Sequence, residues 1–220
     1  LKEDFVSMKL TTPYQITKML GELYANFYNH HYGVPIVKAR FFNSYGAGEV
    51  PGQYRNVIPN FIYRAMKGMP LPFTGTGDET RDFTYVGDLV DGLLRAGYFE
   101  AAIGEEFNLA SGREIKILDM AEKVNELVGN KAGIVIAPPR VWDTKKRLLA
   151  SVDKAAGMIG YKPDQDFDEG LKITIQWFKD NWDAIDRDAE FPPGMSSAVS
   201  GVTDEKELEI KSAEPQAKAS

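Results

Sequence analysis

A tyrosine and a lysine four residues apart are the first side chains of this sequence that could do chemistry. Tyr14 and Lys18 lie in a stretch typical of a helix, where a separation of four places both side chains on one face, one turn apart. A lysine ammonium beside a phenol favours the ionised phenolate. Such a pair could therefore supply a general acid or base that works near neutral pH.

The spacing alone is weak evidence, because Tyr63 and Lys67 repeat it in a second predicted helix. An exposed lysine beside a half-buried tyrosine is the structural alternative for either pair. Residues 13–22 (PYQITKMLGE) resemble the signature of the extended short-chain dehydrogenase/reductase family, whose helix carries a proline, Tyr-x-x-x-Lys and often Gly-Glu. The resemblance implies that Tyr14 and Lys18 are catalytic and also contact NAD. Tyr63 has no such frame.

The resemblance extends to about Asn181 and is to the branch of nucleotide-sugar epimerases, decarboxylases and dehydratases. Residues 40–46 (RFFNSYG) are similar to the segment that ends a Rossmann strand beside the nicotinamide. This implies cofactor contacts at Phe41 and Ser44 and a substrate contact at Asn43, and a strand end that opens into a loop suits that task. An Asx-turn that only ends the strand is the alternative for Asn43.

Two further segments resemble family elements that hold the substrate nucleotide. Residues 56–59 (NVIP) look like a helix start near the diphosphate, with contacts at Asn56 and Val57, and exposed amides at a helix N-terminus suit an anion. Simple N-capping by Asn56 is compatible with this interpretation. Residues 71–73 (LPF) match the stretch along the nucleotide base, and a core position is the alternative for Phe73.

Two arginines are similar to those that contact phosphate in the family. Arg81 lies in residues 75–83 (GTGDETRDF), which resemble a segment whose arginine binds the diphosphate through its planar fork. A surface ion pair with Asp78, Glu79 or Asp82 is the alternative. In residues 140–143 (RVWD), Arg140 would meet phosphate and Asp143 the ribose or base, although tryptophan replaces the glycine common in relatives.

Alternating helices and strands must position these side chains. Thr12 and Gln15 form a capping box around Pro13, which predicts a helix that Gly33 and Pro35 end. The alternation that follows predicts a layered α/β fold. Strands are predicted over 34–42, 71–73, 107–109 and 134–136, and further helices over 57–67, 88–99, 118–128 and 167–182.

The resemblance implies the C-terminal part of a Rossmann-like parallel sheet domain plus a smaller α/β substrate-binding lobe. Residues 1–44 would be the remainder of the NAD-binding domain, to which 83–128 return, and 45–82 with 129–188 would form the nucleotide-sugar-binding lobe. Residues 189–220 are rich in Ser, Ala, Glu and Lys without an apolar period, which predicts a disordered tail.

Composition argues against several classes of function. The 26 basic and 32 acidic residues give a formal charge of -6, which offers no basic field for nucleic acid. There is no cysteine, and the adjacent His30 and His31 match no metal-ligand spacing, so we expect no metal site. No apolar run approaches the roughly 20 residues that cross a bilayer, and no signal peptide opens the chain. We expect a cytoplasmic protein.

The glycine-rich loop through which relatives bind the NAD pyrophosphate does not occur in this sequence, since Gly46-x-Gly48 lacks the third glycine. The family's catalytic serine or threonine should precede Tyr14 by more than the thirteen residues present. We therefore expect a fragment that alone neither holds NAD tightly nor turns over. The Tyr14 helix usually belongs to the dimer interface of the family, so the resemblance also implies a homodimer.

The reaction that the resemblance favours is NAD-dependent 4-epimerisation of a UDP-sugar through a transient 4-keto intermediate. UDP-glucuronate decarboxylation and nucleotide-sugar 4,6-dehydration start with the same oxidation and remain alternatives. A non-catalytic nucleotide-sugar-binding module is the alternative of another class.

Overall fold

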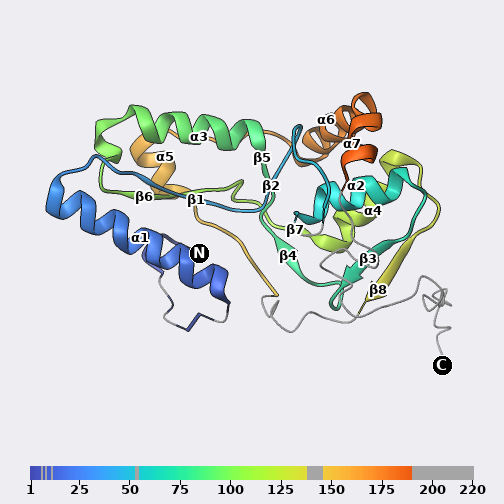
Figure 1. Ribbon diagram of the computed structural model, residues 1–220, viewed down its shortest axis with the longest axis horizontal. Coiled ribbons are helices and arrows are strands. Elements are labelled where there is room, and N and C mark those ends of the chain that lie inside the picture. Colours follow the sequence, from blue (N-terminus) through green and yellow to red (C-terminus); the bar gives the residue numbers. More distant parts are fainter. Residues whose placement is uncertain (6, 8, 11, 53–54, 138–145, 190–220) are drawn as a thin grey trace.

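The computed structural model describes residues 1–5, 7, 9–10, 12–52, 55–137 and 146–189. Within this part of the chain, helices alternate with short strands along an elongated molecule (Figure 1). Three of the four strand pairs are parallel, and one is antiparallel. The predicted α/β class with a parallel sheet arrangement is therefore confirmed. The described elements form two groups, each with its own apolar core.

The first group lies on the left of Figure 1, where β1 and β6 pair in parallel under α3. Helix α3 buries Leu89, Gly92 and Ala96, whose spacing puts them on one face. Gly92 is required there, because a Cβ atom would lie 2.8 Å from the Tyr161 ring. The group consists of β1 (Lys38–Phe41), α3 (Val86–Tyr98), the 3-10 helix η1 (Glu100–Ala102), β6 (Glu106–Leu109) and α5 (Asp153–Ile159).

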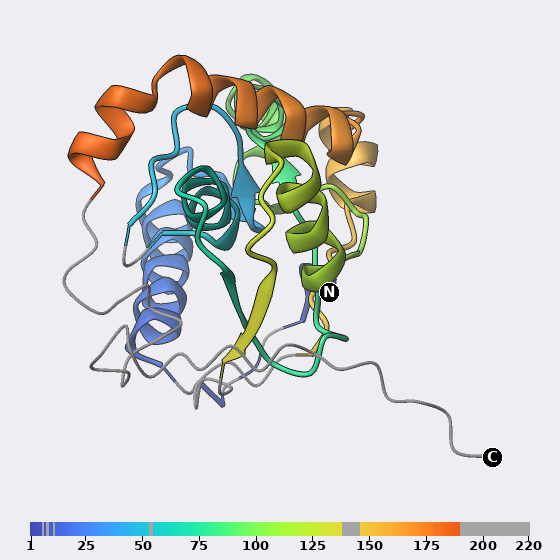
Figure 2. The same ribbon diagram turned by 90° about the vertical axis from the view of Figure 1, so that its right-hand side faces the viewer.

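The second group lies on the right of Figure 1, and Figure 2 shows α2 and α4 packed beneath α6. Its core includes Phe61 of α2, Met120 of α4 and Leu171 of α6, all nearly inaccessible to solvent. Strands β3 and β8 pair in parallel beside these helices. The group consists of α2 (Val57–Met66), β3 (Leu71–Thr74), α4 (Ile117–Val128), β8 (Ile134–Ala137), α6 (Phe167–Asp180) and α7 (Trp182–Asp188).

Two pairs of short strands join the groups. Asp82, fully buried between them, accepts hydrogen bonds from the backbone N–H groups of Ser111, Gly112 and Ala150 and from the Ser111 hydroxyl. Its charge is therefore satisfied by two segments, 111–112 and 150, that are distant from it in sequence. The strands are β2 (Ser44–Tyr45) parallel to β5 (Thr84–Tyr85), and β4 (Thr80–Arg81) antiparallel to β7 (Ile115–Lys116).

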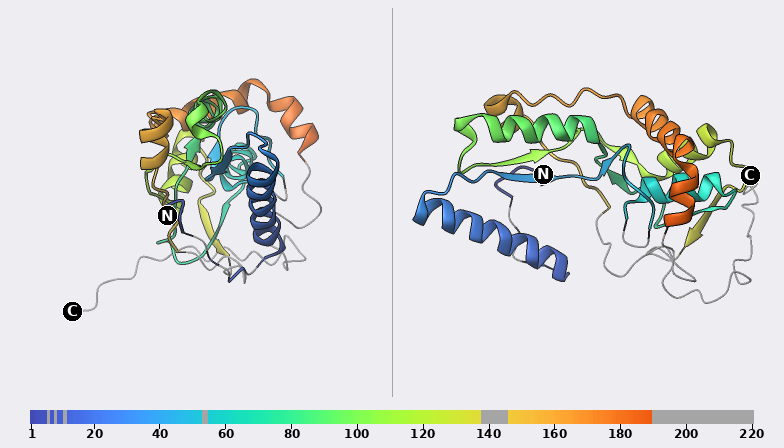
Figure 3. Two further views of the ribbon diagram at one scale, coloured as in Figure 1. Left: turned by 90° about the vertical axis from the view of Figure 1, so that its left-hand side faces the viewer. Right: turned by 45° about the horizontal axis from the view of Figure 1, so that its top comes forward.

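Helix α1 (Pro13–Tyr32) runs alongside β1 at the edge of the molecule (Figure 3). Its predicted capping box is present. The backbone N–H of Gln15 donates to Thr12 Oγ1 at 3.2 Å, and the backbone N–H of Thr12 donates to Gln15 Oε1 at 3.3 Å. Gly33 ends the helix in the left-handed conformation, as predicted. None of the residues of α1 is buried in the described structure.

Some element boundaries differ from the predictions. The strand expected over 34–42 is limited to β1, because Pro35 has no amide hydrogen and the partner strand begins only at Glu106. The helix expected over 167–182 is divided at Asn181, whose side chain donates to the Trp177 carbonyl and competes with the backbone. Helix α3 begins two residues earlier than predicted.

The two cores divide the chain differently from the predicted domains at two places. Helix α4, assigned with 83–128 to the Rossmann part, packs in the core of the second group. Helix α5 was not predicted, and it packs in the first group although 129–188 was assigned to the other lobe. The predicted tail lies, except for Ala189, outside the described residues.

Candidate active site

Tyr14 and Lys18 occupy the first two turns of α1. Lys18 Nζ lies 5.4 Å from the centroid of the Tyr14 ring, within range of a cation–π contact. Tyr14 is 68% exposed and Lys18 is exposed as well, so both side chains are accessible to a ligand. A phenol and an ammonium in this arrangement can exchange a proton with a bound hydroxyl group and hold its oxygen.

The second pair with the same spacing has a different environment. The Tyr63 hydroxyl donates to Asp186 at 2.9 Å, and Lys67 Nζ donates to the same carboxylate at 2.8 Å. Burial and the adjacent Asp186 raise the pKa of Tyr63, which disfavours the phenolate. Tyr63 and Lys67 therefore attach α7 to α2, the structural alternative that the spacing left open.

The carboxyl end of β1 brings Phe41, Asn43 and Ser44 together. Phe41 is 53% exposed at the last position of the strand. Asn43 is held against the neighbouring segment, since its Nδ2 donates to the Asp82 carbonyl at 3.4 Å and its carbonyl accepts from the Thr84 amide at 2.9 Å. The described side-chain bond of Asn43 thus crosses to the segment between β4 and β5 instead of closing a turn of its own.

The N-terminus of α2 is adjacent to this strand end. Asn56 is the N-cap, but its side chain makes no capping bond and Nδ2 donates instead to Glu49 Oε1 at 2.8 Å and to the Ser44 carbonyl at 3.3 Å. Val57 is the first residue of the helix. The structure therefore brings Ser44, Asn56 and Val57 to one place. Burial raises the pKa of the Glu49 carboxyl group beside them.

Arg81 is buried, with 8% of its surface exposed, and its Nη1 donates to the Thr80 carbonyl at 2.8 Å. The proposed surface partners are engaged elsewhere: Asp78 pairs with Lys116, and the Glu79 carboxylate accepts backbone hydrogen bonds from Thr76 and Gly77. The guanidinium therefore lies buried at the junction of the two groups of elements and not at the surface.

The three remaining predicted positions are Phe73, Arg140 and Asp143. Phe73 is only 2% exposed, which favours the core alternative for its ring. Arg140 and Asp143 lie outside the described residues.

The role of Asp82 in joining the two groups was not predicted from the sequence, where Asp82 is only a possible ion-pair partner of Arg81. Its position between Arg81 and the buried Phe83 was the available signal, because an acid in a buried stretch must be satisfied by donors. Its backbone donors come from loops distant in sequence, so no local pattern reveals them.

No described helix has the length and apolar character needed to cross a membrane. No group of three or more metal-binding side chains occurs among the described residues. His31 stacks on Phe27 in α1, with ring centroids 5.3 Å apart.

Comparison with known proteins adds independent evidence. A sequence model of the NAD dependent epimerase/dehydratase family matches residues 2–110. An epimerase from the methanogen Methanothermobacter thermautotrophicus has a similar structure, with a TM-score of 0.84 and 53% identity, over 86% of this chain and 57% of its own.

Two further proteins have related sequences. A Bordetella bronchiseptica enzyme solved in complex with NAD+ and UDP has a TM-score of 0.74 and 39% identity, over 84% of this chain and 58% of its own. The UDP-N-acetyl-alpha-D-glucosaminuronate decarboxylase of Bacillus cytotoxicus is 34% identical over 78% of this chain and 54% of its own length. The chain spans about half the length of the curated relatives that it matches.

Proposed function

The chain belongs to the NAD dependent epimerase/dehydratase family, and on that premise we propose that the whole protein catalyses the NAD-dependent 4-epimerisation of a UDP-sugar. The observation that carries the proposal is the contrast between the two Tyr–Lys pairs. Tyr14 and Lys18 are accessible and in contact with each other, whereas Tyr63 and Lys67 are engaged by Asp186.

The residues around Tyr14 fit a bound NAD. The exposed Lys18 ammonium can donate to the ribose hydroxyl groups, and the exposed ring of Phe41 and the hydroxyl of Ser44 lie at a strand end where a nicotinamide could rest. When bound, NAD would accept the hydride from C4 of the sugar and return it.

Tyr14 would take the proton of the sugar 4-hydroxyl group while the C4–H bond breaks, and the product is a 4-keto sugar. After the sugar turns, Tyr14 would give the proton back to the oxygen at the inverted centre, so that no proton is lost or gained. Lys18 would favour the phenolate by its charge. Asn43 would orient the sugar from the strand end.

The diphosphate would be held on the other side of the site. Arg81 supplies a charge that it cannot lose, and the first-turn amides of α2 at Val57 point their donors outward. Arg140 and Asp143 stay predictions for the phosphate and the nucleoside. Anchoring the substrate by its nucleotide leaves the sugar free to turn, which epimerisation requires.

Decarboxylation of a UDP-uronic acid is the second candidate, and the 34% identity with the Bacillus cytotoxicus decarboxylase favours it. The first step would be the same, because a 4-keto uronic acid can lose carbon dioxide. Dehydration would need an additional acid and base.

The exposed apolar face of α1 supports a homodimer of the whole protein. Leu20, Leu23 and Phe27 are each about half exposed and lie on one side of the helix. A cytoplasmic location stays a prediction.

The test is to incubate the whole protein with UDP-glucose, UDP-glucuronate and UDP-N-acetylglucosamine, with and without added NAD, and to identify products by mass and proton NMR. Unchanged mass with inversion at C4 is the expected result. Loss of carbon dioxide would establish the decarboxylase instead. No turnover of any of the three, even with NAD, would contradict both and favour a binding module.

A further inference from the structure

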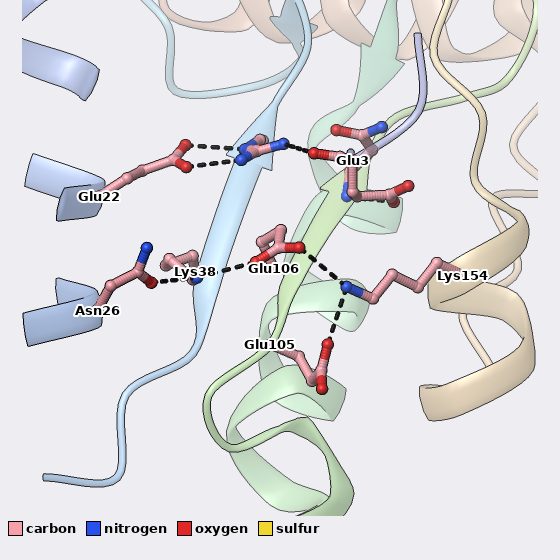
Figure 4. A network of polar contacts seen from close by, with 9 residues as sticks. Glu3, Glu22, Asn26, Lys38, Glu105, Glu106 and Lys154 are labelled. Carbon is pink, nitrogen blue, oxygen red and sulfur yellow. Dashed lines mark hydrogen bonds and ion pairs between the residues drawn. The ribbon is translucent and has the colours of Figure 1, made fainter. Parts of the chain in front are cut away.

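The side of α1 that faces β1 is polar. The Glu22 carboxylate and the Arg40 guanidinium form paired hydrogen bonds, from Nε to Oε1 at 2.8 Å and from Nη2 to Oε2 at 2.6 Å (Figure 4). Such a planar fork fixes orientation as well as distance. The hydrogen bond to Glu22 also raises the pKa of Arg40.

A second contact lies one helical turn further on. Lys38 Nζ donates to Asn26 Oδ1 at 2.5 Å and to Glu106 Oε2 at 2.8 Å (Figure 4). Glu22 and Asn26 are four apart on the helix, and Lys38 and Arg40 are two apart on the strand. The two repeats match, because four helical residues rise about 6 Å and two strand residues about 6.6 Å.

The two contacts fix an antiparallel register between α1 and β1. Continuing it by the same steps takes Lys18 and then Tyr14 past Phe41, the last residue of β1, in the direction of Asn43 and Ser44. The catalytic pair proposed above thus comes level with the strand end that carries Asn43. No residue of α1 is buried, so apolar packing among the described residues does not set this register.

Arg40 also holds the chain that leads into α1. Its Nη1 donates to the backbone carbonyl of Glu3 at 2.7 Å. The carboxylate of the buried Glu3 accepts from the backbone N–H of Asn108 in β6 at 3.0 Å. Arg40 therefore binds residues on both sides of Tyr14 in the sequence. Glu3 lies eleven residues before Tyr14, and Glu22 lies eight residues after it.

We propose that the paired contacts Glu22–Arg40 and Asn26–Lys38 fix the position of α1 along β1. They would thereby position Tyr14 and Lys18 relative to the carboxyl end of β1, with Glu22 and Arg40 as positioning residues. The geometric part of the proposal concerns α1 alone. Its consequence for turnover rests on the proposed function.

The test measures the position of α1 directly in the whole protein. Nitroxide labels are placed at exposed positions 17 on α1 and 94 on α3 through a keto-bearing amino acid, so that cysteines play no part, and the distance distribution is recorded by pulsed electron resonance. We expect a narrow distribution in the parent and a roughly twofold broader one in Glu22→Gln and Arg40→Met.

A matched control comes from the same network. Lys154 pairs with Glu105 at 2.9 Å and Glu106 at 3.2 Å, on the α5 side of β6, and Figure 4 shows it away from α1. Lys154→Met should leave the distribution unchanged. Unchanged distributions in Glu22→Gln and Arg40→Met, or equal broadening in Lys154→Met, would overturn the proposal.

The kinetic consequence is measured on the same variants. In an active protein, Glu22→Gln should lower kcat about tenfold while the KM for the UDP-sugar stays unchanged, because substrate anchoring lies on other elements. If the parent turns over no UDP-sugar, only the proposed function is contradicted. The distance distributions still decide whether Glu22 and Arg40 position α1.

Discussion

Arg81 carries a fixed positive charge that is almost completely buried at the junction of the two groups of elements. Asp82, the next residue, is bonded to two separate segments, 111–112 and 150, and so fixes the backbone that presents this guanidinium. A buried cation that must stay charged is well suited to an anionic ligand.

Replacing Arg81 by methionine should weaken UDP binding to the whole protein by about tenfold to a hundredfold, the usual range for losing hydrogen bonds to a charged group. Calorimetric titration with UDP measures it, and thermal unfolding checks that the variant is folded. Arg95→Met is the control, because Arg95 pairs with Asp91 on the exposed side of α3. Equal UDP affinity in the parent and Arg81→Met would remove Arg81 from the binding site.

The two Tyr–Lys pairs also show what a sequence can reveal at the scale of a residue. Both helices were predictable, but the Tyr–Lys spacing could not distinguish the two pairs. The difference comes from Asp186, which engages Tyr63 and is 123 residues away from it. Only the residues flanking Tyr14 separated the two. The contacts of Asn43 and Asn56 were equally hidden, because they depend on the pairing of β2 with β5 and on a loop carboxylate.

At the scale of elements, Glu49 is a carboxylic acid beside the N-terminus of α2, where Asn56 donates to it and burial disfavours its ionised form. Burial raises the pKa of Glu49, so the folded state binds its proton more tightly than the unfolded state does. The ionised form therefore costs stability above the folded pKa, and this cost disappears as the pH falls below it. Glu49 also puts a negative charge where a diphosphate is expected.

Glu49→Gln should raise the thermal midpoint at pH 7.5, and the difference from the parent should shrink toward pH 4 as Glu49 becomes protonated. UDP should also bind the variant more tightly at pH 7.5. Scanning calorimetry at several pH values measures the first effect. Glu114→Gln serves as an exposed control, because the Arg147 partner lowers the pKa of Glu114 and the sign of its pH dependence is opposite. A constant difference across the pH range would exclude the burial of a charge as the cause.

Elements with a strong local signal were predictable. The capping box and Gly33 gave both ends of α1, and the apolar spacing gave α2 and α4 within one or two residues. Helix α5 has only seven residues, and the strands at the junction have two, too few for a period to show. Tertiary pairing decides whether such short segments form.

At the scale of the whole molecule, short strands and Asp82 lie between the cores of the two groups, and α1 contributes no buried residue to either core. Sequence resemblance predicted two parts but not that α4 and α5 cross between them, because each helix follows a segment of the other part. The chain also spans little more than half of the related solved structures.

These 220 residues alone should not retain NAD, because the sequence contains no glycine-rich loop for the pyrophosphate. Purification by size exclusion, followed by release and quantification of bound nucleotide, measures this. A monomer of these residues that is saturated with NAD would show that the pyrophosphate is held in another way.

The most direct test of Tyr14 as the acid and base is proton NMR at C4 of the UDP-sugar that the whole protein converts, with Tyr14→Phe and Tyr63→Phe compared with the parent. We expect Tyr14→Phe to invert C4 at least about a hundredfold more slowly, whereas Tyr63→Phe keeps the parental rate once folded. Parental turnover in Tyr14→Phe, or an equal loss in both variants, would contradict the role of Tyr14.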